Sequence, residues 1–303
     1  MKFLIPKDDT NGFYPKQLII EPTQRCNMRC FMCNMHAPHV PVGERYTLSK
    51  ATFDTLRPIF PYLQYISYGG NGEPFLAKDI FWQINEVKKV NPKVHIQAFS
   101  NGLLFADNTH LLETTLDNID ELDLSIDAVT PSVYNSIRIG SDINKIFDSL
   151  SNIQRYQPLH SRCKVSIVAL LMRRTISEIV PIVQIAARYS IPKVSFSGPI
   201  WTIDDITCKE LIDDQSTYDK MLNELWCAKN IGKRLGVKVR FHYTPLGSVK
   251  IRKLPLHAQL AIETKHIIKQ SISSLQQHFS AICTLPWRSI EVFASGVVYI
   301  CCL

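Results

Sequence analysis

Three closely spaced cysteines near the N-terminus carry the most chemical information in this chain of 303 residues. They are Cys26, Cys30 and Cys33, in the stretch Glu-Pro-Thr-Gln-Arg-Cys-Asn-Met-Arg-Cys-Phe-Met-Cys that follows an apolar run. No fourth cysteine follows in this loop. A [4Fe-4S] cubane takes one thiolate per iron, so three thiols would leave one iron open to a ligand from outside the protein. The spacing therefore predicts an iron–sulfur cluster with an accessible iron.

A zinc-binding scaffold without catalytic activity is the alternative interpretation. Structural zinc takes four nitrogen or sulfur ligands, and His36 or His39 lies close enough in sequence to be the fourth. Three unrelated core cysteines are a further alternative. Paired zinc knuckles usually show Cys-x-x-Cys at both ends, whereas here a Cys-x-x-x-Cys-x-x-Cys triplet directly follows a strand. The iron–sulfur interpretation is therefore favoured.

Glycine and polar residues gather at three further points, each directly after an apolar strand-like run. They are Tyr-Gly-Gly-Asn-Gly-Glu-Pro at 68–74, Ser100-Asn101-Gly102, and Ser125 with Asp127. In repeated βα units the active residues lie at the carboxyl ends of the strands. We therefore expect these residues to lie near the cysteine loop.

The elements that must position these residues alternate between short β-rich runs and longer runs of helical period. We predict an α/β fold, a partial (β/α)6 TIM-like barrel with a parallel sheet and a short C-terminal β-hairpin. The expected strands are Gln17–Glu21, Tyr65–Tyr68, Val94–Phe99, Glu121–Ile126, Lys164–Leu170 and Lys193–Ser197, with Val237–Tyr243 as an addition. The expected helices are Ser49–Phe60, Lys78–Val90, Asn108–Asn118, Ile143–Tyr156, Ile176–Tyr189 and Gln215–Leu235.

Composition limits the other function classes. The formal net charge is +7, but Lys and Arg are scattered and no nucleic-acid-binding module appears, so nucleic acid is not a favoured partner. No apolar run reaches the ~18 residues that cross a bilayer, and no signal peptide is recognisable, so we expect a cytoplasmic protein without a membrane partner. Nine cysteines in such a protein are expected to be free thiols or ligands.

The run Glu-Pro-Thr-Gln-Arg-Cys-Asn-Met-Arg-Cys-Phe-Met-Cys resembles the signature of radical S-adenosylmethionine (radical SAM) enzymes. The resemblance implies that the open iron binds S-adenosylmethionine (SAM). One electron then cleaves SAM to a 5′-deoxyadenosyl radical that abstracts a substrate hydrogen. It also implies a partial (β/α)6 barrel, a small-molecule or peptide substrate, and a reducing electron-transfer protein of the ferredoxin or flavodoxin type.

The resemblance also assigns cofactor-binding roles, although it identifies no catalytic residue. Gly70, Gly72 and Glu73 resemble the family's Gly-Gly-Glu element, which binds the methionyl amino group. The remaining candidates are polar residues for the ribose and carboxylate, a carboxylate-binding arginine, and a position that packs on adenine: Ser100, Asn101, Ser125, Asp127, Arg138 and Met32. Met32 stands where the family often has an aromatic residue, with Phe31 one place earlier. Helix or turn caps are the alternative for Ser100 and Asp127, and a surface ion pair for Arg138.

The C-terminal segment resembles the start of a SPASM or twitch extension. It runs from Cys283-Thr-Leu-Pro-Trp through a hairpin signal at Ser295-Gly296 to Cys301-Cys302. The family pattern needs further cysteines, so the chain is expected to be a fragment of a longer parent protein. Cys283 and Cys301 are candidate ligands of an auxiliary iron–sulfur cluster there, and a hairpin with incidental cysteines is the alternative. The expected domains are a core at 1–243, a linker and helix at 244–280, and the truncated extension at 281–303.

Overall fold

The computed structural model describes residues 14–160, 162–198, 205–243, 289–295 and 297–299. The chain divides into two compact units. The first contains Met1–Ser125, Arg138–Val165 and Thr284–Leu303, and the second contains Ile126–Ile137 and Ser166–Cys283. The predicted linker and helix at 244–280, Cys283 and Cys301 lie outside the described residues.

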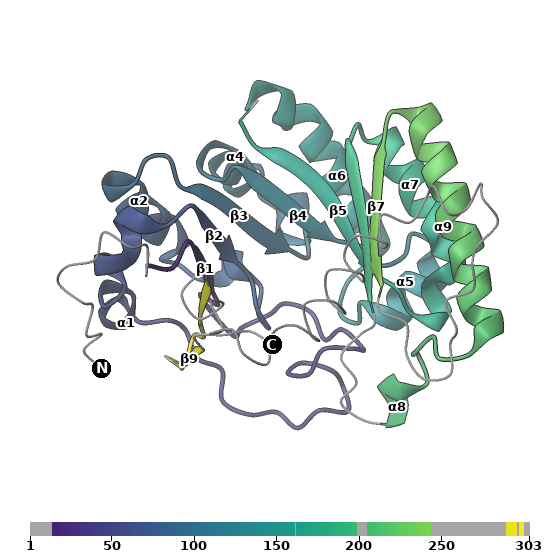
Figure 1. Ribbon diagram of the computed structural model, residues 1–303, viewed down its shortest axis with the longest axis horizontal. Helices are drawn as coiled ribbons and strands as arrows, with labels where there is room; N and C mark the ends of the chain where they lie inside the picture. The colour runs from purple at the N-terminus through teal and green to yellow at the C-terminus, as the bar shows by residue number, and fades with distance from the viewer. Residues whose placement is uncertain (1–13, 161, 199–204, 244–288, 296, 300–303) are drawn as a thin grey trace, which may run out of the picture. The chain divides into compact units, whose positions relative to one another are not determined.

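Parallel strands form the centre of the first unit (Figure 1). They are β1 (Gln17–Ile20), β2 (Tyr65–Tyr68), β3 (His95–Ser100) and β4 (Glu121–Ser125), and each pairs in parallel with the next. The described helices of this unit are α1 (Lys50–Asp54), η1 (Arg57–Tyr62), η2 (Pro74–Leu76), α2 (Ile80–Val90), α3 (Leu104–Asp107), α4 (Thr109–Asn118), α6 (Ile143–Tyr156) and η3 (Gln157–Leu159).

The C-terminal segment adds two strands to this sheet. β8 (Ser289–Val292) pairs in parallel with β1, and β9 (Val298–Tyr299) pairs antiparallel with β8. The predicted hairpin is thereby confirmed. Its parallel pairing beside β1 was not predicted, because residues 17 and 289 are brought together by the tertiary fold and no local pattern encodes the contact.

Side chains alternate between the two faces of these strands. One face is apolar and fully buried, with an exposed fraction of 0% at Leu18, Ile20, Ile66, Ile96 and Leu122. Burial of such side chains supplies about 1.5–3 kcal/mol each relative to exposure. The opposite face carries polar side chains.

The second unit contains β5 (Lys164–Leu170, which begins in the first unit), β6 (Lys193–Gly198) and β7 (Lys238–Tyr243), paired in parallel. Its described helices are α5 (Pro131–Ile137), η4 (Arg173–Glu178), α7 (Ile179–Arg188), α8 (Asp205–Cys208) and α9 (Gln215–Leu235). The carboxylate of Asp214 caps α9, and Gly236 ends it in the left-handed conformation at φ +76°. The α/β fold with an open, partial barrel and a parallel sheet is as predicted.

Two of the predicted helices are wrong as single elements. The run Ser49–Phe60 divides into α1 and the 3₁₀ helix η1, because Pro58 and Pro61 remove N–H donors and disfavour the α conformation before them. The run Ile176–Tyr189 begins inside the 3₁₀ helix η4 and becomes α-helical only from Ile179.

Candidate functional site

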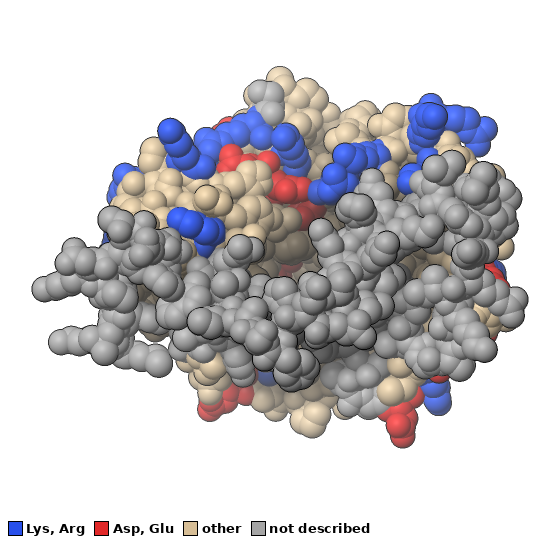
Figure 2. Space-filling model, in the orientation of Figure 1, with Lys and Arg blue, Asp and Glu red and all other residues tan. Residues whose placement is uncertain are grey.

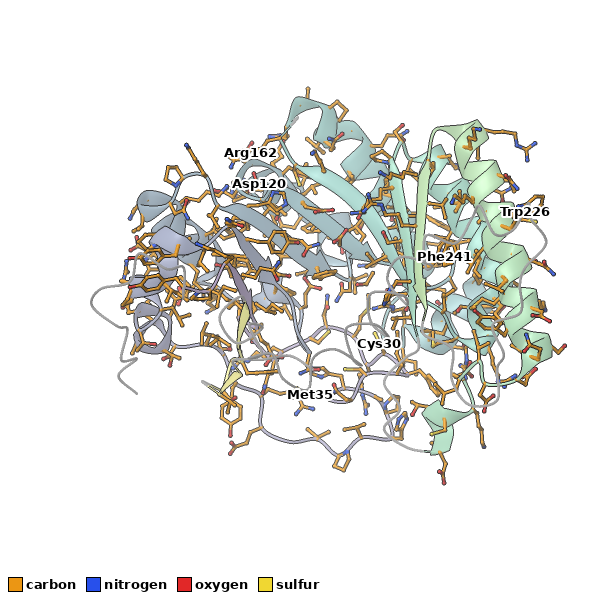
Figure 3. The ribbon with its side chains drawn as sticks, in the orientation of Figure 1. Cys30, Met35, Asp120, Arg162, Trp226 and Phe241 are labelled. Carbon is orange, nitrogen blue, oxygen red and sulfur yellow. The ribbon has the colours of Figure 1, made fainter. Side chains whose placement is uncertain are left out.

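The cysteine loop leaves β1 and returns to its own starting point. At its base the backbone N–H of Leu48 donates to the carbonyl of Pro22 at 2.9 Å, and that of Gln24 donates to Tyr46 at 2.8 Å. Inside the loop Cys33 N–H donates to the Cys30 carbonyl at 3.0 Å, which forms a tight turn. Cys30 lies on the side toward which the arrows of β3 and β4 point (Figure 3). The thiols are therefore carried at the carboxyl end of the sheet, where the βα pattern predicted them.

Each of the three thiols has an N–H donor beside its sulfur. Asn101 Nδ2 lies 3.9 Å from Cys26 Sγ, Arg138 Nη1 lies 3.6 Å from Cys30 Sγ, and the His36 backbone N–H lies 3.3 Å from Cys33 Sγ. Hydrogen bonds to ligand sulfur are one of the means by which proteins tune iron–sulfur clusters. The donor set of three thiols with matched N–H groups therefore fits a [4Fe-4S] cluster.

Burial controls the protonation of the first thiol. Desolvation raises the pKa of Cys26 to about 11, the Met28 backbone N–H opposes this, and the nearby Glu73, Cys30 and Cys33 add to it. Without metal this thiol is protonated at neutral pH. Because a metal ligand must be the thiolate, cluster assembly has to displace that proton.

The glycine-rich turn after β2 is built directly against the cysteine loop. The Glu73 backbone N–H donates to the Arg25 carbonyl at 2.8 Å. A Cβ on Gly72 would lie 2.0 Å from the Thr23 carbonyl oxygen, and Gly70 adopts φ +110° with no room for a Cβ beside Glu21. Only glycine allows this approach of two backbones. The predicted residue Gly72 is thus brought to the cysteine loop, and Gly70 lies against the Glu21 side chain at the end of β1.

Glu73 is buried and connects the ends of β2 and β3. Its carboxylate accepts from Ser100 Oγ at 2.9 Å, from the Asn101 backbone N–H at 2.9 Å and from the Phe75 backbone N–H at 3.4 Å. Burial raises the pKa of Glu73 to about 7, while these three donors and the charge of Arg138 lower it. The carboxylate therefore fixes the local structure whether or not it also contacts SAM.

The other predicted cofactor-binding residues have different surroundings. Ser100 Oγ donates to Glu73 and accepts from the Gly102 N–H at 3.0 Å, as expected of a turn cap. Ser125 is half-buried at the end of β4, and Met32 is half-buried in the cysteine loop. Asp127 belongs to the second unit, where its carboxylate accepts from the Leu170 N–H at 2.8 Å. Their contacts with SAM stay predictions.

Arg138 is buried against the cysteine loop, at 8% exposure. The sequence alternative of a surface ion pair is therefore wrong for this residue. The following residues pack on the same loop, since the Arg29 N–H donates to the Ile139 carbonyl at 2.7 Å.

Sequence reasoning missed Glu21, a buried carboxylate at the end of β1. Its oxygens accept from Asn71 N at 2.8 Å, Asn71 Nδ2 at 3.0 Å, Gln24 Nε2 at 2.9 Å and Ala294 N at 3.4 Å. It thus joins the glycine-rich turn, the cysteine loop and the segment after β8. An acidic residue ending an apolar strand just before Pro22 was the signal that could have found it.

The zinc alternative gains little from His36. His36 Nε2 already lies 2.8 Å from the Gln24 carbonyl oxygen. Among the residues that the structure describes, no three His, Cys, Asp or Glu side chains are grouped so that they could hold a metal ion, and this applies to the three loop cysteines as much as to a zinc site. In that same part of the chain, no helix is long and apolar enough to cross a membrane.

A family model for the radical SAM superfamily matches residues 20–186, which include the cysteine loop, the glycine-rich turn and β2 to β5. This chain belongs to the radical SAM superfamily. It is therefore an enzyme of the class that uses a [4Fe-4S] cluster and SAM, and the zinc scaffold is not favoured. Cys26, Cys30 and Cys33 stay the predicted ligands.

Two curated relatives illustrate the range of this superfamily. A GTP 3',8-cyclase of Clostridium botulinum is 29% identical over 152 residues, which are 47% of this chain and 44% of the relative. A protein of Pyrococcus furiosus named tungsten-containing aldehyde ferredoxin oxidoreductase cofactor-modifying protein is 33% identical over 126 residues, 41% of this chain and 34% of the relative. The chain thus spans less than half the length of these relatives.

Solved structures share the fold over most of the chain. SuiB of Streptococcus suis bound to S-adenosylmethionine has a TM-score of 0.64 at 16% identity, covering 95% of this chain and 60% of SuiB. Native anSMEcpe with bound AdoMet has a TM-score of 0.63 at 16% identity, covering 95% of this chain and 74% of that protein. At this identity the likeness concerns the fold alone.

Proposed function

We propose that this chain binds SAM at the open iron of a [4Fe-4S] cluster held by Cys26, Cys30 and Cys33, and acts on a peptide or carbohydrate-like substrate. Membership of the radical SAM superfamily supports the cleavage chemistry. The observation that carries the proposal is the set of three thiols, each with its own N–H donor, on one loop against the glycine-rich turn.

When bound, the cluster and SAM supply one-electron cleavage to a 5′-deoxyadenosyl radical that removes a substrate hydrogen. The protein's own part is to hold and orient these groups. Gly70 and Gly72 allow the turn to approach the loop, and Glu73 ties that turn to Ser100 and Asn101. Arg138 brings a positive charge to the same place, which suits the methionyl carboxylate.

The choice of substrate class is supported by the polar face of the sheet in the first unit. On this face Ser67 Oγ donates to Gln97 Oε1 at 3.2 Å, and Gln97 Nε2 donates to Asp123. Carboxylate and amide oxygens accept from hydroxyl, amide or ammonium groups, whereas the negative charge of a carboxylate repels a polyphosphate. This polar face therefore favours a peptide or a carbohydrate over a nucleoside triphosphate such as GTP, which the name of the cyclase relatives contains.

The electron is proposed to come from a reducing protein of the ferredoxin or flavodoxin type. Such a protein would dock through charged groups, and Lys and Arg occur at several separate places on the face drawn in Figure 2.

The first test measures cleavage itself. After anaerobic reconstitution and reduction with dithionite, we expect 5′-deoxyadenosine and methionine to form from SAM. A variant with Cys26, Cys30 and Cys33 all changed to Ala should form neither. Cys208 and Cys227 lie outside the loop, one exposed and one half-buried, so their double Ala variant is the matched control and should keep activity. Cleavage by the triple variant would reject the assignment.

The second test separates the substrate classes. Peptide and oligosaccharide mixtures prepared in deuterated form should transfer deuterium into 5′-deoxyadenosine, whereas GTP should not stimulate its formation. A GTP-dependent increase, with a cyclised nucleotide product, would replace the proposed substrate class and leave the cleavage chemistry standing.

A further inference from the structure

Arg138 makes a contact that its sequence resemblance does not account for. Its Nη1 lies 3.6 Å from Cys30 Sγ, and the two residues are only 8% and 9% exposed. A guanidinium so close to a cluster ligand is weakly screened by solvent, so its charge acts strongly on that sulfur.

The backbone around Arg138 fixes the guanidinium to the cysteine loop. The Arg29 N–H donates to the Ile139 carbonyl at 2.7 Å, within the sequence between Cys26 and Cys30. Gly140 adopts φ +90°, and a Cβ there would lie 3.7 Å from Met28 Cα, so the two segments are in direct contact. Arg138 therefore moves with the loop, and its contact with Cys30 does not depend on a bound ligand.

Charge near a cluster alters how easily it is reduced. Reduction adds one electron to the cluster and makes it one unit more negative, while no covalent bond forms or breaks. A nearby cation and an N–H donor to a ligand sulfur stabilise the more negative state, which raises the reduction potential. Asn101 Nδ2 beside Cys26 and the His36 N–H beside Cys33 are uncharged donors, so Arg138 is the charged member of this set.

We propose that Arg138 is a positioning residue for electron entry: it raises the reduction potential of the cluster through Cys30 before SAM is bound. This inference rests on the proposed function, because it requires the cluster at these three thiols. It differs from a carboxylate-binding role, which would act only when SAM is present.

The test is a redox titration of the cluster, followed by electron paramagnetic resonance (EPR), in the absence of SAM. Arg138→Met should lower the equilibrium constant for one-electron reduction about tenfold, which corresponds to a potential about 59 mV lower. Arg155→Met is the matched control, since this arginine is exposed on α6, and it should leave the potential unchanged. Arg138→Gln keeps an N–H donor without the charge and should also lower the potential.

Failure of this inference and failure of the proposed function give different results. If Arg138→Met does not load a cluster, Arg138→Gln decides the question. A variant that carries about four irons with an unchanged potential overturns the inference, as does a shift that appears only after SAM is added. A wild-type protein without any reducible cluster would instead overturn the proposed function.

Discussion

The contact between the glycine-rich turn and the cysteine loop predicts a large effect for Gly72→Ala. The new Cβ would lie 2.0 Å from the Thr23 carbonyl oxygen and 2.8 Å from the Arg25 carbonyl oxygen. Both neighbours are backbone atoms, so no side chain can rotate away. To reach even 3.0 Å from Thr23 O, the two backbones must separate by about 1 Å, which is the difference between 3.0 and 2.0 Å.

The size of the effect follows from what that separation disrupts. Overpacking of a close contact costs about 1–3 kcal/mol. Loss of the 2.8 Å hydrogen bond from Glu73 N–H to the Arg25 carbonyl adds about 0.5–1.5 kcal/mol. We therefore expect the free energy of unfolding to fall by about 2–4 kcal/mol. A displacement of about 1 Å at a catalytic site lowers rates by about a hundredfold, so SAM cleavage should fall by that order.

Urea unfolding and 5′-deoxyadenosine formation under anaerobic conditions measure the two effects. Gly43→Ala is the matched control, because its Cβ would meet only the flexible Arg45 Nη1 at 3.6 Å. The control should behave as wild type. If Gly72→Ala also matches wild type in stability and cleavage, the close packing of the turn on the loop is not what holds the site together.

Two substitutions, a pH dependence and an iron analysis give further tests. Glu73→Gln should raise the dissociation constant for SAM about tenfold to a hundredfold in a binding titration, through loss of a charge-assisted hydrogen bond. Because burial raises the pKa of Glu73 from 4.5 to about 7, the folded protein keeps a proton that the unfolded chain has lost. Wild-type stability should therefore fall by up to about 3 kcal/mol as pH rises from 4.5 to 7, and the Gln variant should lack this fall in urea unfolding. Glu21→Gln places an amide N–H₂ against N–H donors and should cost about 1–3 kcal/mol of stability by the same assay. Iron analysis of the reconstituted chain should give about four irons, since Cys283 and Cys301 are too few to hold a second cubane; eight would contradict this.

The strands were predictable because each is a short apolar run that ends in glycine or polar residues. β2 and β5 have the predicted bounds, and β1, β3, β4 and β6 differ by one residue at one or both ends. The helix α5 was missed, since Pro131–Ile137 is too short to show a helical period. Its first residue, proline, was its local signal, because proline favours the first turn of a helix.

The sequence predicted which residues form the candidate site, but it did not predict most of the contacts between them. Spacing alone identified the three thiols and the glycine-rich turn. The sequence could not show that Glu73 accepts from Ser100 and Asn101, because those hydrogen bonds join residues that are 27 and 28 positions apart. Likewise Glu21 accepts from Asn71, which is 50 positions away, and from Ala294, which the pairing of β1 with β8 brings beside it.

The most direct measurement of the central claim is the EPR spectrum of the reduced protein with and without SAM. Three thiolates from Cys26, Cys30 and Cys33 leave one iron open, so the spectrum should change when SAM binds there. The signal should be absent from the variant with all three changed to Ala. A reduced cluster whose spectrum does not respond to SAM, or a colourless protein that carries zinc, would contradict the claim.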